Sequence, residues 1–163
     1  MHLYTQLEYC PGGTLAQLKE RGGAFTEANA LAVAQQVPCH TFPVCDECVA
    51  QVAGGLQYLH AQGLVHRELS SHSLFVAGDQ DSPSIKIGHL RGLVRGSHVE
   101  ESQIDWTDPA QARALCCASY EAVHETMTAD RWPGADIFAM GMSMLDLATH
   151  EELPSRECTC CCS

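Results

Sequence analysis

Hydrophobic and polar residues alternate near the start of the chain. Residues 3–9 follow this period of two and are rich in strand formers, which predicts a β-strand. The Pro-Gly-Gly sequence at 11–13 ends the strand, and Thr14 is placed to cap a short helix through Leu18. Two glycines at 22–23 predict the end of that helix.

A longer helix is predicted to follow, with Thr26 as its N-cap and with Leu31 and Ala34 on its apolar stripe. The stripe stops at residues 37–51, which hold two prolines and several cysteines, and resumes at Val52. A proline inside a helix costs about 3 kcal/mol. We therefore expect residues 37–51 to loop out of the helix or to break it.

The edges of this insert suggest an origin. It begins with Val37, whose codons begin with GT, and it ends with Gln51, whose codon can end with AG. One hypothesis is an intron read as protein. The other is a genuine surface insertion.

The middle of the chain predicts a β-hairpin. Two short apolar runs, 74–76 and 84–87, flank the turn-forming residues 78–83. Residues 92–118 show no period and are expected to be a loop. Residues 135–148 are apolar nearly all round, which predicts a buried helix. The end, 151–163, is expected to be an unstructured cysteine-rich tail.

The composition limits the classes of function. With 163 residues the chain is long enough for one domain with a core. A formal charge of −11, with only nine Lys and Arg, argues against binding to nucleic acid or to an anionic membrane surface. There is no secretory signal and no apolar run of membrane-spanning length, so we expect an intracellular protein, cytoplasmic or nuclear.

The ten cysteines are unevenly placed. Without a secretory signal, a disulfide framework is a weak interpretation. Cys39, His40, Cys45 and Cys48 are of a type that binds structural zinc; alternatively, they lie in a segment foreign to the fold. The adjacent pair at 116–117 would be redox-sensitive if it were exposed.

Two segments carry the candidate chemistry. Residues 66–76 begin His-Arg-Glu-Leu, and residues 85–90 end Gly-His-Leu. They resemble the catalytic loop and metal-binding turn of protein kinases, which read His-Arg-Asp-Leu-x-x-x-x-Asn and Asp-Phe-Gly. In this resemblance, Glu68 stands at the catalytic base, Ser73 at the metal-binding asparagine and His89 at the metal-binding aspartate.

Other matching segments resemble the Wee-type group, the inhibitory kinases of the cell cycle: residues 3–6, 8–15, 86–90, 99–101 and 135–139. The resemblance implies an α+β, kinase-like fold, seen here as a mostly helical large-lobe fragment with a short hairpin over residues 1–150. The small lobe, with its glycine-rich loop and strand lysine, is expected to be missing.

The resemblance also assigns roles by position. It implies ATP and Mg²⁺ as cofactors in the family, with the adenine contacted by Leu7, Glu8, Cys10 and Leu74. The positions expected to support the site are His66, Arg67, Glu121 and Asp136. Asp136 is expected to hold the backbone of the catalytic loop, and Glu121 to end the activation segment.

The substitutions at the chemical positions predict impaired phosphotransfer. Mg²⁺ prefers hard oxygen ligands, so His89 and Ser73 both weaken its site, and no metal ligand is assigned. Glu68 keeps a carboxylate but adds a methylene, and displacement on that scale can cost about 100-fold in rate. We therefore expect a degenerate Wee-like homologue that binds a protein partner or substrate. The alternatives are an incomplete version of an active protein Ser/Thr/Tyr kinase and a zinc-stabilised scaffold.

Overall fold

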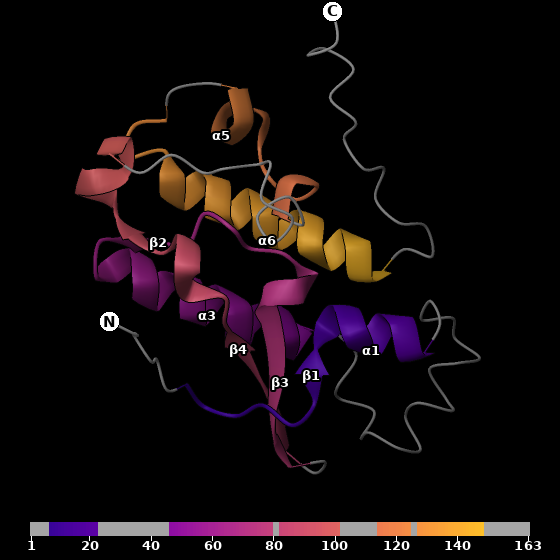
Figure 1. The fold of residues 1–163 in the computed structure, drawn as a ribbon. Helices are drawn as coiled ribbons and strands as arrows, with labels where there is room; N and C mark the ends of the chain where they lie inside the picture. Colours follow the sequence, from indigo (N-terminus) through magenta and orange to yellow (C-terminus); the bar gives the residue numbers. More distant parts are fainter. Residues whose placement is uncertain (1–6, 23–45, 80–81, 102–113, 125–126, 149–163) are drawn as a thin grey trace, which may run out of the picture.

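The computed structural model describes residues 7–22, 46–79, 82–101, 114–124 and 127–148 (Figure 1). The principal helices are α1 (Leu15–Gly22), α3 (Asp46–Ala61), α5 (Tyr120–His124) and α6 (Trp132–Ala148). The strands are β1 (Gly13–Thr14), β2 (Leu64–Val65), β3 (Leu74–Asp79), β4 (Ser82–Ile87) and β5 (Val94–Arg95). The described residues also form three 3₁₀ turns: η1 (Ser71–Ser73), η2 (Leu90–Gly92) and η3 (Gly96–Glu101).

Two small antiparallel sheets organise the strands. The first has the order β1-β3-β4, in which Phe75 lies opposite both Thr14 and Lys86. The second pairs β2 with β5 and places Val65 opposite Val94. The predicted hairpin is confirmed as β3 and β4. The expectation that 92–118 is only loop is wrong, because β5 and η3 lie in its first part.

The start of α1 follows from its sequence. Thr14 Oγ1 accepts a hydrogen bond from the Gln17 backbone N–H at 3.2 Å, and Gln17 Oε1 accepts one from the Thr14 N–H at 3.0 Å. This reciprocal capping box satisfies two donors that a helix start otherwise leaves unpaired. The predicted Thr14 cap is confirmed, and so is the end of the helix at Gly22. The strand predicted at 3–9 lies partly outside the described residues, and residues 7–9 form no strand.

Helix α3 begins earlier than the sequence suggested. It starts at Asp46, so residues 46–51 are helical rather than looped out. These residues contain no proline, and buried Cys48 continues the apolar stripe of Val52 and Leu56 at a spacing of four. The side chain of Gln51 accepts a 2.6 Å hydrogen bond from the Ile85 backbone N–H of β4. The rest of the insert lies outside the described residues.

The main core lies between α3, α6 and the inner face of the β3–β4 hairpin. Figure 1 shows α6 beside α3, with α5 on the other side of α6. The buried members of this core are Leu15, Cys48, Val52, Leu56, Leu69, Leu74, Ile85, Cys117, Ala139, Met144 and Leu147. A smaller cluster of Val65, Met127 and Trp132 packs near the start of α6.

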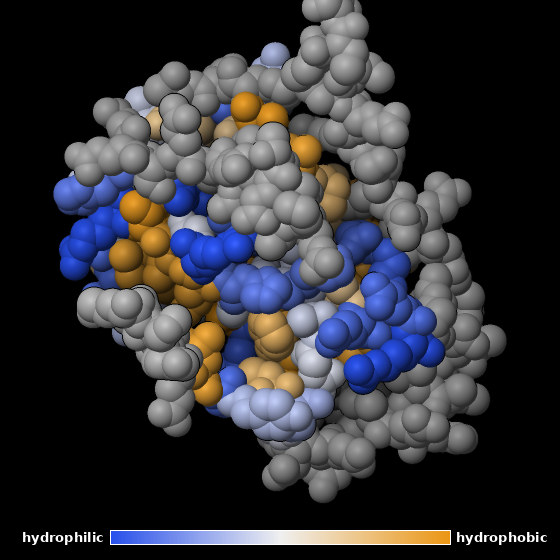
Figure 2. All heavy atoms as spheres, in the orientation of Figure 1, coloured by the Kyte–Doolittle hydropathy of each residue, from blue (hydrophilic) through white to orange (hydrophobic). Residues whose placement is uncertain are grey.

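Helix α6 is only half buried, which corrects the expectation of a helix buried all round. Asp136, Ala139 and Leu147 face inward, whereas Ile137 and Phe138 are exposed. Figure 2 shows hydrophobic residues beside strongly hydrophilic ones on one face of the molecule. The large hydrophobic side chains that reach the surface are Leu7, Tyr9, Tyr58, Leu90, Tyr120, Ile137, Phe138 and Leu145. Within the described residues, no helix combines the length and the apolar character needed to cross a bilayer.

Candidate functional site

The candidate site is the loop of residues 66–73, which connects β2 to β3 and is anchored by Asp136 of α6. Asp136 Oδ2 accepts a 2.8 Å hydrogen bond from the His66 backbone N–H, and Oδ1 accepts one from the Arg67 N–H at the same distance. The His60 Nε2 at the end of α3 lies 2.9 Å from Oδ2. One buried carboxylate therefore fixes the start of the loop and joins it to two helices.

His66 joins this loop to the second motif. Its Nε2 lies 2.9 Å from the carbonyl oxygen of Gly88, and because a carbonyl only accepts, Nε2 carries the proton. From the other end of the loop, the Gly88 N–H donates to the Ser73 carbonyl at 2.8 Å. The backbone of Gly88 is thus held by both ends of the loop, directly before His89.

The side chain of Arg67 joins the loop to η2 and to the start of α6. Its Nε donates a 2.8 Å hydrogen bond to the Gly92 carbonyl, and its guanidinium lies 5.7 Å from the ring centroid of Trp132. Burial lowers the pKa of the Arg67 guanidinium, while the carboxylates of Glu68 and Asp136 act in the opposite direction. Arg67 has a left-handed φ of 69°, a conformation that is costly for a residue with a side chain. These contacts hold it there.

Ser73, at the position of the metal-binding asparagine, is used inside the loop. Its Oγ donates to the Ser70 carbonyl and accepts from the Ser70 N–H, both at 2.8 Å. The side chain is 0% exposed. The hydroxyl closes the turn and does not face a site that a ligand can enter.

Glu68, at the position of the base, is buried and packs against η2, which follows the second segment. A Cβ added to Gly92 would lie 2.8 Å from the Glu68 side chain, so the carboxylate sits directly against this glycine. Its Oε2 is 4.0 Å from Nε of Arg91 in η2, the turn that follows the second segment. The structure therefore brings Glu68 beside 91–92 and leaves it little access to solvent.

His89 lies on the outer side of the hairpin. Its φ of 53° is left-handed, and its ring meets the edge of Phe75 at a centroid distance of 5.4 Å. His89 is exposed, in contrast to Ser73 and Glu68. The three substituted positions thus face different surroundings.

The position of Leu74 differs from the expected one. Leu74 is fully buried in the core, so its side chain is not available to a ring bound in a cleft. Successive side chains of a strand point to opposite faces, and the half-buried Phe75 therefore faces away from the core toward His89. The period of two in this strand could have indicated Phe75 instead.

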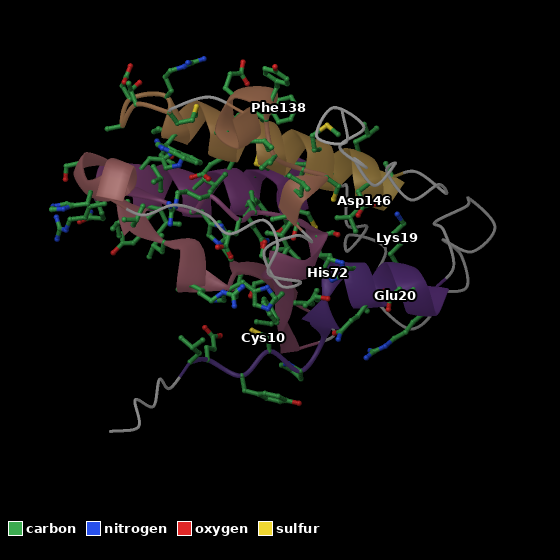
Figure 3. The ribbon with its side chains drawn as sticks, turned by 45° about the horizontal axis from the view of Figure 1, so that its top comes forward. Cys10, Lys19, Glu20, His72, Phe138 and Asp146 are labelled. Atoms are coloured by element: carbon green, nitrogen blue, oxygen red, sulfur yellow. The ribbon has the colours of Figure 1, made fainter. Side chains whose placement is uncertain are left out.

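The other residues expected to contact adenine lie along the edge of the hairpin. Leu7 and Glu8 are exposed, and Glu8 Oε2 lies 3.6 Å from Nζ of Lys86 on β4. Because both side chains are largely exposed, this ion pair contributes little. The half-buried thiol of Cys10 points to the Glu8 carbonyl at 3.9 Å, and Figure 3 shows Cys10 on the N-terminal segment.

A second anchor of the loop was missed by the sequence analysis. Asp146 of α6 accepts a 2.9 Å hydrogen bond from Ser71 Oγ in the loop, and its other oxygen accepts one from Lys19 of α1 at the same distance. Figure 3 shows Lys19 and Asp146 facing each other, with His72 of the loop nearby. No local motif marks this contact, because its partners are far apart in sequence.

Glu121 lies in the first turn of α5, after Ser119. The Ser119 hydroxyl accepts a 3.2 Å hydrogen bond from the Ala122 N–H, so it caps this helix. Hydrogen bonds from the Glu121 backbone and from Ser119, with the positive charge of Arg131, hold the pKa of the Glu121 carboxyl below its usual value. Glu121 is thus placed in the first turn of α5.

The residues present do not fit a Mg²⁺ site. The Ser73 hydroxyl is engaged within its own loop, and His89 offers nitrogen where the ion prefers oxygen. Among the residues that the structure describes, no three of His, Cys, Asp and Glu are grouped to hold a metal. Of the four expected zinc ligands, Cys48 packs in the core, and Cys39, His40 and Cys45 lie outside the described residues.

Three features reproduce the order of the protein kinase motifs. They are a loop that begins His-Arg, a second turn after a hairpin, and an aspartate of a central helix that binds the backbone of the loop. The chain belongs to the protein kinase domain family, which it matches over residues 1–159. The predicted family is confirmed.

The chain is 30% identical to a Wee1-like protein kinase 2 of Danio rerio over 165 residues, which is 94% of this chain and 28% of that protein. It is 26% identical over 171 residues to the protein of the same name in Xenopus tropicalis, covering 96% of this chain and 27% of that protein. It is also similar to the interferon-induced, double-stranded RNA-activated protein kinase of Rattus norvegicus, at 33% over 86 residues, 53% of this chain and 14% of the relative. The chain thus spans less than a third of the length of these relatives.

Proposed function

We propose that this chain is a Wee-like protein kinase homologue that is impaired in phosphotransfer and acts by binding a protein. The observation that carries the proposal is the state of Ser73. At the position where the family places a metal ligand, this side chain is fully buried and bonded to both polar groups of the Ser70 backbone. Phosphoryl transfer depends on metal ions that neutralise the phosphate charge.

The surroundings of Glu68 and His89 support the same proposal. Glu68 is packed against Gly92, and a base has to come within hydrogen-bonding reach of the substrate hydroxyl. His89 lies against Phe75, outside the loop. No residue of the sequence matches the glycine-rich loop or the strand lysine. A complete ATP site would also need these two elements.

The residues that hold the loop support a role in binding. Asp136 and Asp146 of α6 both hold the loop of residues 66–73 by hydrogen bonds. These bonds keep the surface of the loop in one shape whether or not the chain transfers phosphate. We infer that an intracellular protein, such as another kinase or a kinase substrate, is the partner class. The net charge of −11 favours a partner with a basic surface.

Thermal unfolding of the purified chain with ATP, in the presence of Mg²⁺ or of a chelator, tests the loss of the metal site. We expect any shift in melting temperature to be the same in both conditions, because Ser73 and His89 supply no metal site. A matched His89→Ala variant should behave in the same way. Stabilisation by ATP that requires Mg²⁺ and is lost in His89→Ala would contradict the proposal.

The chain covers only 28% and 27% of the length of two Wee1-like relatives. This favours a second candidate function. In it, the full protein carries a small lobe and transfers phosphate to protein Ser, Thr or Tyr. Sequencing the spliced transcript across codons 30–60 and to both ends tests this candidate. A longer frame that encodes a glycine-rich loop and a strand lysine would favour it, and the activity would then depend on Glu68, Ser73 and His89.

A further inference from the structure

Two adjacent cysteines, Cys116 and Cys117, lie sulfur to sulfur just before α5. Their Sγ atoms are 3.7 Å apart, within the range of an S–H···S hydrogen bond. Cys117 is buried in the main core, at 1% exposure, whereas Cys116 is half-buried. The Cys117 thiol is therefore closed to solvent, and it contacts the Cys116 thiol on the side that faces the core.

Among the described residues, two polar groups of α6 act on the pair. The Ser143 hydroxyl acts on Cys117 and favours its thiolate, whereas the Asp146 carboxylate raises the pKa of both thiols. Asp146 is itself bonded to Lys19 and Ser71. The hydrogen bond between the sulfurs outweighs Asp146 at Cys116 and lowers the pKa of that thiol from 9.0 to about 7. The same contact, together with burial, raises the pKa of Cys117.

We propose that Cys116 is a modification site that forms mixed disulfides with small-molecule disulfides, with Cys117 as the positioning residue that stabilises its thiolate. The Cys116 thiolate attacks one sulfur of the small disulfide. A new S–S bond joins Cys116 to that sulfur, and the old S–S bond breaks. The second sulfur leaves as a thiolate and takes up a proton. Cys116 is oxidised and the small disulfide is reduced, so no further oxidant is needed.

The geometry favours this product over a bond between the two cysteines. A disulfide needs its sulfurs about 2.05 Å apart and usually joins residues whose Cα atoms lie about 4.4–6.8 Å apart. Neighbouring residues have Cα atoms only about 3.8 Å apart. Cys117 is in addition fixed in the core between α3 and α6. The half-buried Cys116 is accordingly the position that carries the adduct.

Oxidised glutathione, added to the full chain at pH 7, is a suitable probe. After an acid quench, peptide mass spectrometry gives the rate at each cysteine. We expect Cys116 to react about 5- to 10-fold faster than the half-buried Cys10. Cys117→Ala should slow Cys116 about 5- to 10-fold, since a return to the ordinary pKa removes about 98% of the thiolate while each remaining thiolate reacts faster. Cys117→Ser keeps a donor and should stay within about 3-fold of the wild type.

Slow modification of the buried Cys48 in each variant shows that the fold is intact. If Cys117→Ala unfolds, Cys117→Ser and the pH profile of the wild type decide the question. A midpoint near pH 7 for the rate at Cys116 supports the proposal, and a midpoint near 9 overturns it. It is also overturned if Cys116 reacts no faster than Cys10, if a folded Cys117→Ala leaves the rate unchanged, or if the product is a Cys116–Cys117 disulfide.

Discussion

Lys19 of α1 donates hydrogen bonds to both the Oδ1 atom and the backbone carbonyl of Asp146, a residue 127 positions later in the chain. The two side chains are 15% and 18% exposed, so the pair is only partly screened by water. Asp146 also accepts a hydrogen bond from Ser71, so this contact joins α1 to the loop of residues 66–73 through α6.

Lys19→Met should lower the free energy of unfolding by about 1–2 kcal/mol, because it removes a charge-assisted donor and keeps the alkyl stem. Arg21→Met, an exposed change on the same helix, should stay within about 0.5 kcal/mol. Urea denaturation measures both. In a double-mutant cycle with Asp146→Asn, a coupling energy near zero would contradict the importance of this contact.

Asp136→Ala should be the most damaging single change at the loop. It leaves the N–H groups of His66 and Arg67 without their acceptor in a buried region, which costs about 3–5 kcal/mol. Asp136→Asn keeps one acceptor oxygen and should cost about 2–3 kcal/mol. Chemical denaturation checks the order of the two variants. An Asp136→Ala protein as stable as the wild type would show that the loop does not depend on this carboxylate.

Ser73→Ala should lower the free energy of unfolding by about 2–3 kcal/mol, because the Ser70 N–H and carbonyl both lose a buried partner. The exposed Ser97→Ala change is the matched control and should have an effect below about 0.5 kcal/mol. The same denaturation series measures both variants. A neutral Ser73→Ala would show that these two hydrogen bonds do not hold the loop together.

Gln51 tests whether residues 46–51 belong to the fold. Gln51→Ala removes the acceptor for the Ile85 N–H and should cost about 1–2 kcal/mol. Gln57→Ala, an exposed change on the same helix, makes the same replacement without that contact and should be nearly neutral. Equal stability of the two variants would favour the view that the whole insert is foreign to the fold.

The pKa of Glu121 makes a prediction about pH. Because the folded-state pKa is lowered, the interactions of this carboxylate stabilise the folded chain above its ordinary value of 4.5. The contribution is lost as the pH falls from there through the folded-state pKa. An NMR titration should place the pKa of Glu121 below 4.5, and Ser119→Ala should move it upward. A titration at or above 4.5 in the wild type would contradict the prediction.

Local chemistry was predictable from the sequence, and distant contacts were not. The Thr14 cap depends on residues within one helical turn, and the hairpin depends on a run of turn residues between two apolar segments. The kinase family could be predicted because its loop motifs have fixed positions. Lys19 and Asp146 belong to no motif, so only the folded chain brings them together.

Two residues show how the surrounding helix or strand decides which side a side chain presents. Cys48 lies in α3 on the stripe of Val52 and packs in the core as a small apolar residue. Leu74 was assigned by its place in a motif, yet the alternation of the strand turns it into the core and turns Phe75 outward. In both cases, the side that a residue presents depends on the helix or strand around it.

The bonds of Ser73 also bear on which side chains this position can accept. An asparagine at this position has no hydroxyl to close the turn and must fit a larger side chain into a site with no exposed surface. A Ser73→Asn change would therefore lower the stability of the folded chain. The packing of the loop itself thus opposes the asparagine that protein kinases carry at this position.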